Sequence, residues 1–112
     1  MEHPMYPPAG GELSTLRRDL APETLKAFHA FSRQVFAEGA LDARTKQLIA
    51  VAVAHTTQCP YCIRGHTEEA LKAGASDKQI MEAIWVAAEM RAGGAYAHST
   101  LALDTIRQAH SV

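Results

Sequence analysis

The chain has 112 residues and a mass of 12.1 kDa, the size of one compact domain, so we expect a single domain over residues 1–112. Its residues are 47% hydrophobic and 21% charged, which is typical of a folded protein and excludes a mainly disordered one. The 11 basic and 12 acidic residues give a net charge of −1 with no block of one sign, which disfavours nucleic acid and anionic membranes as partners.

The N-terminal sequence and the length of the apolar runs indicate the cellular location to expect. Met1-Glu2-His3-Pro4 has no basic stretch followed by an apolar one, so a secretory signal is not expected. The longest strictly apolar run, Leu48 to Ala54, is far shorter than the roughly 20 residues that cross a bilayer. We therefore expect a cytoplasmic, soluble protein. In a reducing compartment two neighbouring cysteines indicate a redox or metal site more than a structural bridge.

Helix signals begin after an N-terminal segment, residues 1–12, that we expect to be an extended arm because of its prolines and glycines (Pro4, Pro7, Pro8, Gly10 and Gly11). A first helix is expected from Pro22 to Ala37, with Gly39 as its stop. Asp42 is a plausible N-cap for a second helix, central and mostly buried. The β-branched residues within this helix also fit a short buried strand, which remains open as an alternative.

Three more helices are expected in the second half of the chain. The first begins at Cys59-Pro60 and runs to Ala73, before Gly74. The second follows a capping box of Ser76 and Gln79 and ends at Gly93-Gly94, and the third runs from about Ala95 to Ala109. No segment alternates with period two, so the sequence predicts an all-α fold of about five helices.

The side chains available for the core indicate an oligomer. Only 6% of the residues are aromatic and alanines are frequent, so the helices can approach closely but each buries little large side chain. Further burial between subunits would then stabilise the fold. Trp85 is expected in the core or at such a subunit interface.

The cysteines and one histidine form the array Cys59-Pro60-Tyr61-Cys62-Ile63-Arg64-Gly65-His66, which is C-x2-C-x3-H. On a helix these offsets place Cys59, Cys62 and His66 on one face. Cα atoms one helical turn apart lie within disulfide range, so the two thiols can oxidise and reduce without a change of backbone. The first turn of a helix stabilises a thiolate, and a neighbouring imidazole can take its proton. The array therefore predicts a reactive dithiol.

A zinc site is the main alternative for this array. His55, Cys59, Cys62 and His66 supply two imidazoles and two sulfurs, a set that suits tetrahedral zinc. The redox interpretation needs neither a metal nor a cofactor, and no glycine-rich phosphate loop indicates a nucleotide. The tetrapeptide Cys-Pro-Tyr-Cys also resembles the glutaredoxin motif, but no proline follows Pro60 and the pattern is helical, which disfavours that fold.

The residues around the array resemble a known family. They are Arg44-Thr45-Lys46-Gln47-Leu48-Ile49-Ala50 before it, and Ala70-Leu71-Lys72-Ala73-Gly74-Ala75 and Ile80-Met81-Glu82-Ala83-Ile84 after it. In this order they resemble the carboxymuconolactone decarboxylase superfamily, specifically its AhpD-like alkylhydroperoxidase branch. The resemblance implies an all-α fold assembled as a homotrimer or homohexamer. It also implies a peroxidase, because the lactone decarboxylases of the family lack the cysteine pair.

The resemblance further implies a role for each residue of the array. Cys62 would attack a hydroperoxide substrate and become a sulfenic acid, and Cys59 would condense with it to a disulfide that an external dithiol reduces. His66 would relay the proton. The position of Cys59 at the helix N-cap argues differently, since it makes Cys59 the better stabilised thiolate.

Gln47 departs from the family pattern, which has a glutamate of the proton relay twelve residues before the first cysteine. Glutamine cannot accept a proton at neutral pH, but it can orient the imidazole or a water by hydrogen bonds. His55, four residues before Cys59, is a candidate for the missing base, and a polar residue at a helix end is its other interpretation. A catalytically weak or idle oligomeric module of the same family therefore remains an alternative.

Overall fold

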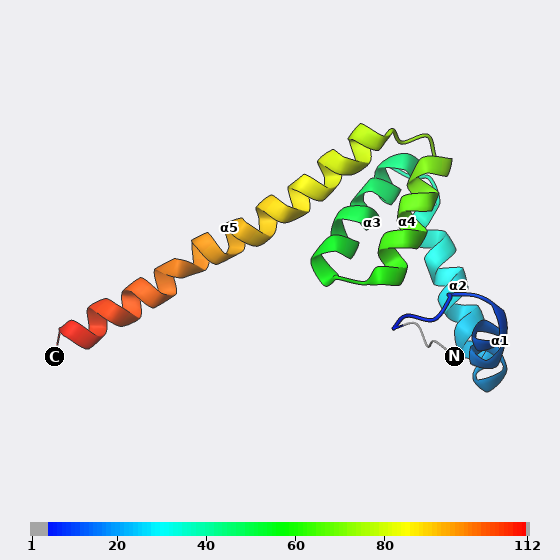
Figure 1. The fold of residues 1–112 in the computed structure, drawn as a ribbon, viewed down its shortest axis with the longest axis horizontal. Helices are drawn as coiled ribbons and strands as arrows, with labels where there is room; N and C mark the ends of the chain where they lie inside the picture. Colours follow the sequence, from blue (N-terminus) through cyan, green and yellow to red (C-terminus); the bar gives the residue numbers. More distant parts are fainter. Residues whose placement is uncertain (1–4, 112) are drawn as a thin grey trace.

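The computed structural model describes residues 5–111, and this part of the chain contains five α-helices and no strand. The all-α prediction is confirmed. The helices, in chain order, are α1 (Gly11–Leu20), α2 (Pro22–Phe36), α3 (Ala43–Thr57), α4 (Pro60–Lys72) and α5 (Asp77–His110) (Figure 1). Met1 to Pro4, the first residues of the expected arm, lie outside the described residues.

The expected arm over residues 1–12 is wrong at its C-terminal end, because a helix begins at Gly11. Only residues 5–10 of the described chain precede it. The first turn of α1 carries Glu12 and the last turn carries Arg17 and Arg18, charges that complement the helix dipole at both ends. Gly10-Gly11 therefore mark the start of a helix where an extended arm is expected.

The next two helices lie close to their predicted positions. Pro22 is in the first turn of α2, which ends at Phe36, one residue before the predicted Ala37. Asp42 caps α3, since its side chain accepts a hydrogen bond of 2.7 Å from the Thr45 N–H. This backbone hydrogen bond is the main reason that the pKa of Asp42 is lowered. The run from Leu48 to Ala54 lies within α3, so the strand alternative is wrong.

The last two predicted helices are one. The capping box of Ser76 and Gln79 is confirmed, but α5 then continues through Gly93-Gly94 to His110. Glycine has a low helix propensity, yet it keeps its N–H donor and so continues the hydrogen-bond ladder that proline would break. The predicted helix end at Gly93-Gly94 is therefore wrong, because the neighbouring alanines, which favour helix, outweigh two glycines.

The core lies where α3, α4 and the first half of α5 meet, and the second half of α5 extends away from it (Figure 1). Val51, Ala70, Ala75 and Ile80 form the buried cluster, with Leu48 and Ile84 packed against it. Ala70 has an exposed fraction of 0%, so the absence of a larger side chain there lets α4 lie close to its neighbours. No helix within residues 5–111 is long and apolar enough to cross a membrane.

Candidate active site

The first cysteine follows a sharp turn between α3 and α4. Gln58 ends α3 in the left-handed conformation, with φ of 58° and ψ of 48°. The backbone N–H groups of Gln58 and Cys59 both donate to the Ala54 carbonyl, the second over 3.2 Å. The turn places Cys59 at the N-cap of α4, beside the backbone N–H groups of the first turn that have no partner within the helix.

A hydrogen bond from the backbone of Cys62 to the sulfur of Cys59 links the two cysteines. The Cys59 Sγ accepts the backbone N–H of Cys62 at 3.2 Å, so the sulfur does what a serine or aspartate oxygen usually does at an N-cap. Both cysteines are free and half-buried. The structure therefore places the Cys59 sulfur against the first turn of the helix that carries Cys62.

These contacts separate the pKa values of the two thiols. A hydrogen bond from the Cys62 side chain, followed by that from the Cys62 backbone N–H, lowers the pKa of Cys59. The same side-chain hydrogen bond, together with burial and the charge of Cys59, raises the pKa of Cys62. Cys59 is thus the first thiol to lose its proton, and Cys62 keeps its own as the donor.

The imidazole of His66 is held from α3. His66 Nδ1 lies 2.8 Å from Gln47 Oε1, and because an amide oxygen only accepts, the histidine donates Nδ1–H. In the neutral ring Nε2 then carries the lone pair and is the one basic position. The expectation that Gln47 can orient the imidazole agrees with this contact.

One face of His66 is covered by Phe36, the last residue of α2. The two rings are stacked, with centroids 5.1 Å apart and planes inclined by 28°. Next to Phe36, the carbonyl of Val35 accepts a 2.9 Å hydrogen bond from Lys46 Nζ, and the carbonyl of Ala37 accepts another. Phe36 lies within the predicted helix from Pro22 to Ala37, but nothing local in the sequence indicates its partner thirty positions away.

His55 has a different partner. Its Nδ1–H is donated over 2.7 Å to the Val51 carbonyl, one turn earlier in α3. Among the described residues no hydrogen bond joins His55 to Cys59 or Cys62. Residues 5–111 also contain no group of three or more His, Cys, Asp or Glu side chains that could hold a metal ion, so the four predicted zinc ligands do not come together.

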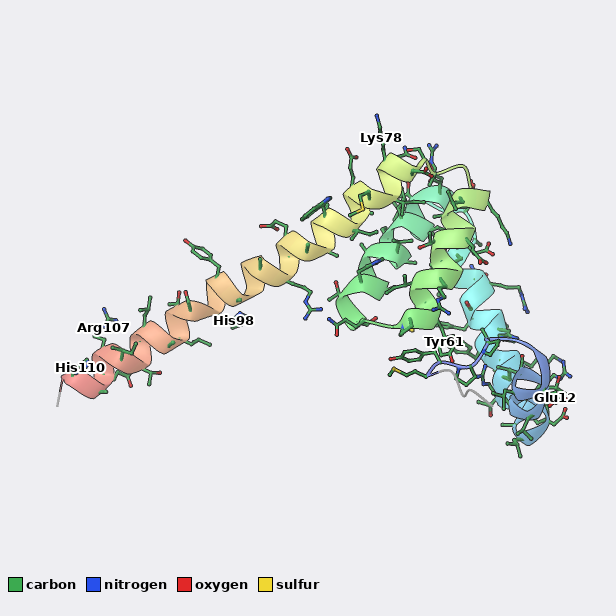
Figure 2. All side chains as sticks on the ribbon, viewed as in Figure 1. Glu12, Tyr61, Lys78, His98, Arg107 and His110 are labelled. Atoms are coloured by element: carbon green, nitrogen blue, oxygen red, sulfur yellow. The ribbon has the colours of Figure 1, made fainter. Side chains whose placement is uncertain are left out.

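Tyr61, between the cysteines, is held by the N-terminal segment. Its hydroxyl donates to the Pro7 carbonyl at 2.6 Å, and its ring meets that of Tyr6 edge to face, with centroids 6.0 Å apart. Figure 2 shows Tyr61 at the N-terminal end of α4, facing the segment that precedes α1. A cavity of about 290 Å³ adjoins this contact, lined by Pro7, Pro8, Ala9, Leu13, Arg17 and Tyr61. Part of the segment expected to be an extended arm therefore packs against Tyr61 of the dithiol motif.

The pKa order of the thiols predicts which one reacts first with an alkylating reagent. Because only the thiolate reacts with iodoacetamide, Cys59 should be labelled at lower pH than Cys62 when the reaction is followed by peptide mass spectrometry between about pH 6 and 9. Cys62→Ala removes the thiol donor and should move Cys59 labelling to higher pH. Cys62→Ser, which keeps a hydroxyl donor, should move it less. Labelling of Cys62 before Cys59 would contradict this order.

Comparisons with known proteins agree with the fold, and the family match covers Gln47, His55, Cys59, Cys62 and His66. The model of the carboxymuconolactone decarboxylase family matches residues 22–105. The protein of Paracoccus denitrificans described as protein 4 in cox locus is 71% identical over 80 residues, which are 71% of this chain and 72% of that protein. A crystal structure from Methanobacterium thermoautotrophicum has 40% identity and a TM-score of 0.70, over 74% of this chain and 93% of that one.

A second solved structure carries a suggestion about function. It is a carboxymuconolactone decarboxylase family protein of Thermotoga maritima with a suggested part in the antioxidative response. It is 25% identical, with a TM-score of 0.55, over 74% of this chain and 95% of that one. The family match extends from α2 through most of α5 and includes the dithiol, and this chain therefore belongs to the carboxymuconolactone decarboxylase family.

Proposed function

We propose that this chain is a thiol-dependent peroxidase that reduces hydroperoxides through Cys59, Cys62 and His66. The observation that carries the proposal is the hydrogen-bonded pair of Cys59 and Cys62 at the start of α4, in which the pKa of Cys59 is lowered and that of Cys62 is raised. A dithiol of this kind suits reversible oxidation by a peroxide. The Thermotoga maritima relative, with its suggested part in the antioxidative response, supports the same class of chemistry.

In the first step the Cys62 sulfur attacks the peroxide. His66 Nε2 takes the proton of the Cys62 thiol, and the resulting thiolate attacks one oxygen of the hydroperoxide. The O–O bond breaks as the S–O bond forms, which leaves a sulfenic acid on Cys62. The departing alkoxide takes the proton back from His66 and leaves as an alcohol. The raised pKa of Cys62 means that this step needs a base, and His66 lies one turn away on the same helix.

In the second step Cys59 resolves the sulfenic acid. The Cys59 thiolate attacks the Cys62 sulfur, the S–O bond breaks, and hydroxide leaves and is protonated to water. The lowered pKa of Cys59 favours this step, because its sulfur loses its proton more readily than an ordinary thiol and lies beside Cys62. An external dithiol, available in a reducing cytoplasm, then reduces the disulfide and is itself oxidised. The cycle converts one hydroperoxide and one dithiol into an alcohol, water and a disulfide.

The same pKa order favours a second assignment, in which Cys59 attacks the peroxide and Cys62 resolves the sulfenic acid. If Cys59 attacks the peroxide, its lowered pKa makes the thiolate easier to form than at Cys62, and the Cys62 thiol would donate the proton to the leaving alkoxide. The proposal gives first attack to Cys62 because this is the cysteine nearer to His66 in the helix, and because the family resemblance implies it. The two assignments differ in which sulfur becomes the sulfenic acid.

A peroxide-consumption assay tests the enzyme and the assignment together. With a dihydrolipoyl or thioredoxin-type donor, the protein should consume hydroperoxide, and Cys62→Ser should abolish turnover. Labelling with a sulfenic-acid reagent should persist in Cys59→Ser and be lost in Cys62→Ser. The reverse labelling pattern would exchange the two roles. If the thiols are reactive but no peroxide is consumed with any of these donors, the protein is a catalytically idle member of the family, and the proposal is contradicted.

Gln47→Glu tests the proton relay. A carboxylate at this position would still accept the His66 Nδ1–H and would also stabilise the cation formed when Nε2 takes a proton. We expect the peroxide reduction rate to rise by about tenfold or more, a share of the ~10²–10⁴-fold that general acid–base catalysis contributes. Gln47→Leu, which removes the hydrogen bond, should lower the rate. An unchanged rate in Gln47→Glu would count against the relay.

We also propose that the working form is a homotrimer or homohexamer. The support is the large apolar surface left on the chain, where Trp85 is 66% exposed, Met90 65% and Tyr96 83%, all along α5. Large apolar patches of this kind mark interaction surfaces. Sedimentation equilibrium should give three or six times 12.1 kDa, and Trp85→Glu should lower that mass. A wild-type monomer at micromolar concentration would contradict this proposal.

A further inference from the structure

We propose that Phe36 is a positioning residue that holds the His66 imidazole in the orientation needed for proton transfer, and that Lys46 secures Phe36 in this role. The inference rests on the proposed function, in which His66 exchanges a proton with Cys62. It concerns residues of α2 and α3 that lie outside the C-x2-C-x3-H array.

The hydrogen bond to Gln47 fixes the ring of His66 in one direction only. This bond lies along the Nδ1–H of the imidazole, so the ring can still tilt about the line to the Gln47 oxygen. The Phe36 ring removes that freedom, because it is stacked against the imidazole face at 5.1 Å and a tilt would break the contact. The hydrogen bond to Gln47 acts in the plane of the imidazole and the Phe36 ring acts on its face. Together they fix the direction in which Nε2 points.

An aromatic ring suits this position during proton transfer. His66 is neutral before it takes a proton and cationic afterwards. A phenyl ring stacks on a neutral aromatic ring, and its negative face also attracts a cation. Phe36 can therefore hold the imidazole through both halves of the reaction. An aliphatic side chain of similar size would fill the space without directing the ring.

Lys46 explains why the end of a helix can serve as a rigid support. Phe36 is the last residue of α2, where the final carbonyls have no partner within the helix and the backbone tends to fray. Lys46 Nζ donates to the carbonyls of Val35 and Ala37, on either side of Phe36, and its charge complements the C-terminal end of the helix dipole. Lys46 precedes Gln47 in α3, so one turn of α3 contacts both the backbone that carries the Phe36 ring and, through the Gln47 amide, the imidazole of His66.

The test compares Phe36→Leu with the conservative Phe36→Tyr. The first readout is the His66 Nδ1–H resonance in the proton NMR spectrum, assigned by its loss in Gln47→Leu. The second is the rate at which hydroperoxide oxidises Cys62, with the rate of Cys59 alkylation as an internal control. We expect Phe36→Leu to broaden the resonance and slow Cys62 oxidation by about tenfold, less than the ~10²-fold that a 1 Å misplacement of a reacting group can cost. Phe36→Tyr should retain both.

Lys46→Met and Lys46→Arg provide a second pair in case Phe36→Leu fails to fold. Lys46→Met should broaden the same resonance, and Lys46→Arg should preserve it. A sharp resonance and an unchanged rate of Cys62 oxidation in Phe36→Leu, or in Lys46→Met if Phe36→Leu does not fold, would overturn the inference. The NMR readout needs no turnover, so its loss in Phe36→Leu supports the positioning role even if the wild-type protein consumes no peroxide, an outcome that would contradict the proposed function alone.

Discussion

The hydrogen bond between the Cys62 backbone N–H and the Cys59 sulfur is the interaction on which the site depends. It satisfies a helix N–H that would otherwise lack a partner, and it fixes the two cysteines side by side at 3.2 Å from nitrogen to sulfur. Because the Cys62 thiol donates to the same sulfur, one thiol loses its proton more readily and the other less readily. Two identical side chains thereby acquire different chemistry from their places in a single helical turn.

Helix α3 supplies most of what surrounds this turn. Its inner face carries Val51, the largest fully buried side chain among the described residues, which packs in the core with Ala70 of α4. Its N-terminal half carries Lys46 and Gln47, which reach the end of α2 and the imidazole of His66. The packing that stabilises the fold therefore also sets the distance between α3 and α4, and with it the hydrogen bond to the imidazole. Substitutions in this core should disturb the site through that distance.

The fold could be predicted from the sequence wherever the signal lies within a few residues. Asp42 and Ser76 cap helices by bonding to backbone groups three positions away, and both caps are confirmed. The helix end predicted at Gly93-Gly94 is wrong, since a glycine weakens a helix without breaking its hydrogen bonds. The stacking of Phe36 on His66, and the support from Lys46, join residues from three helices. Such contacts arise only once the helices have packed, so no local pattern could indicate them.

The proposed chemistry requires that Cys59 and Cys62 form a disulfide with each other and that this disulfide can be reduced again. Intact-mass and peptide mass spectrometry of the reduced protein after one equivalent of hydroperoxide measures this. The account predicts the loss of two hydrogens, a peptide linking Cys59 to Cys62 within one chain, and full recovery of the starting mass on addition of a dithiol. Thiols that remain reduced, or that gain oxygen without forming this link, would contradict it.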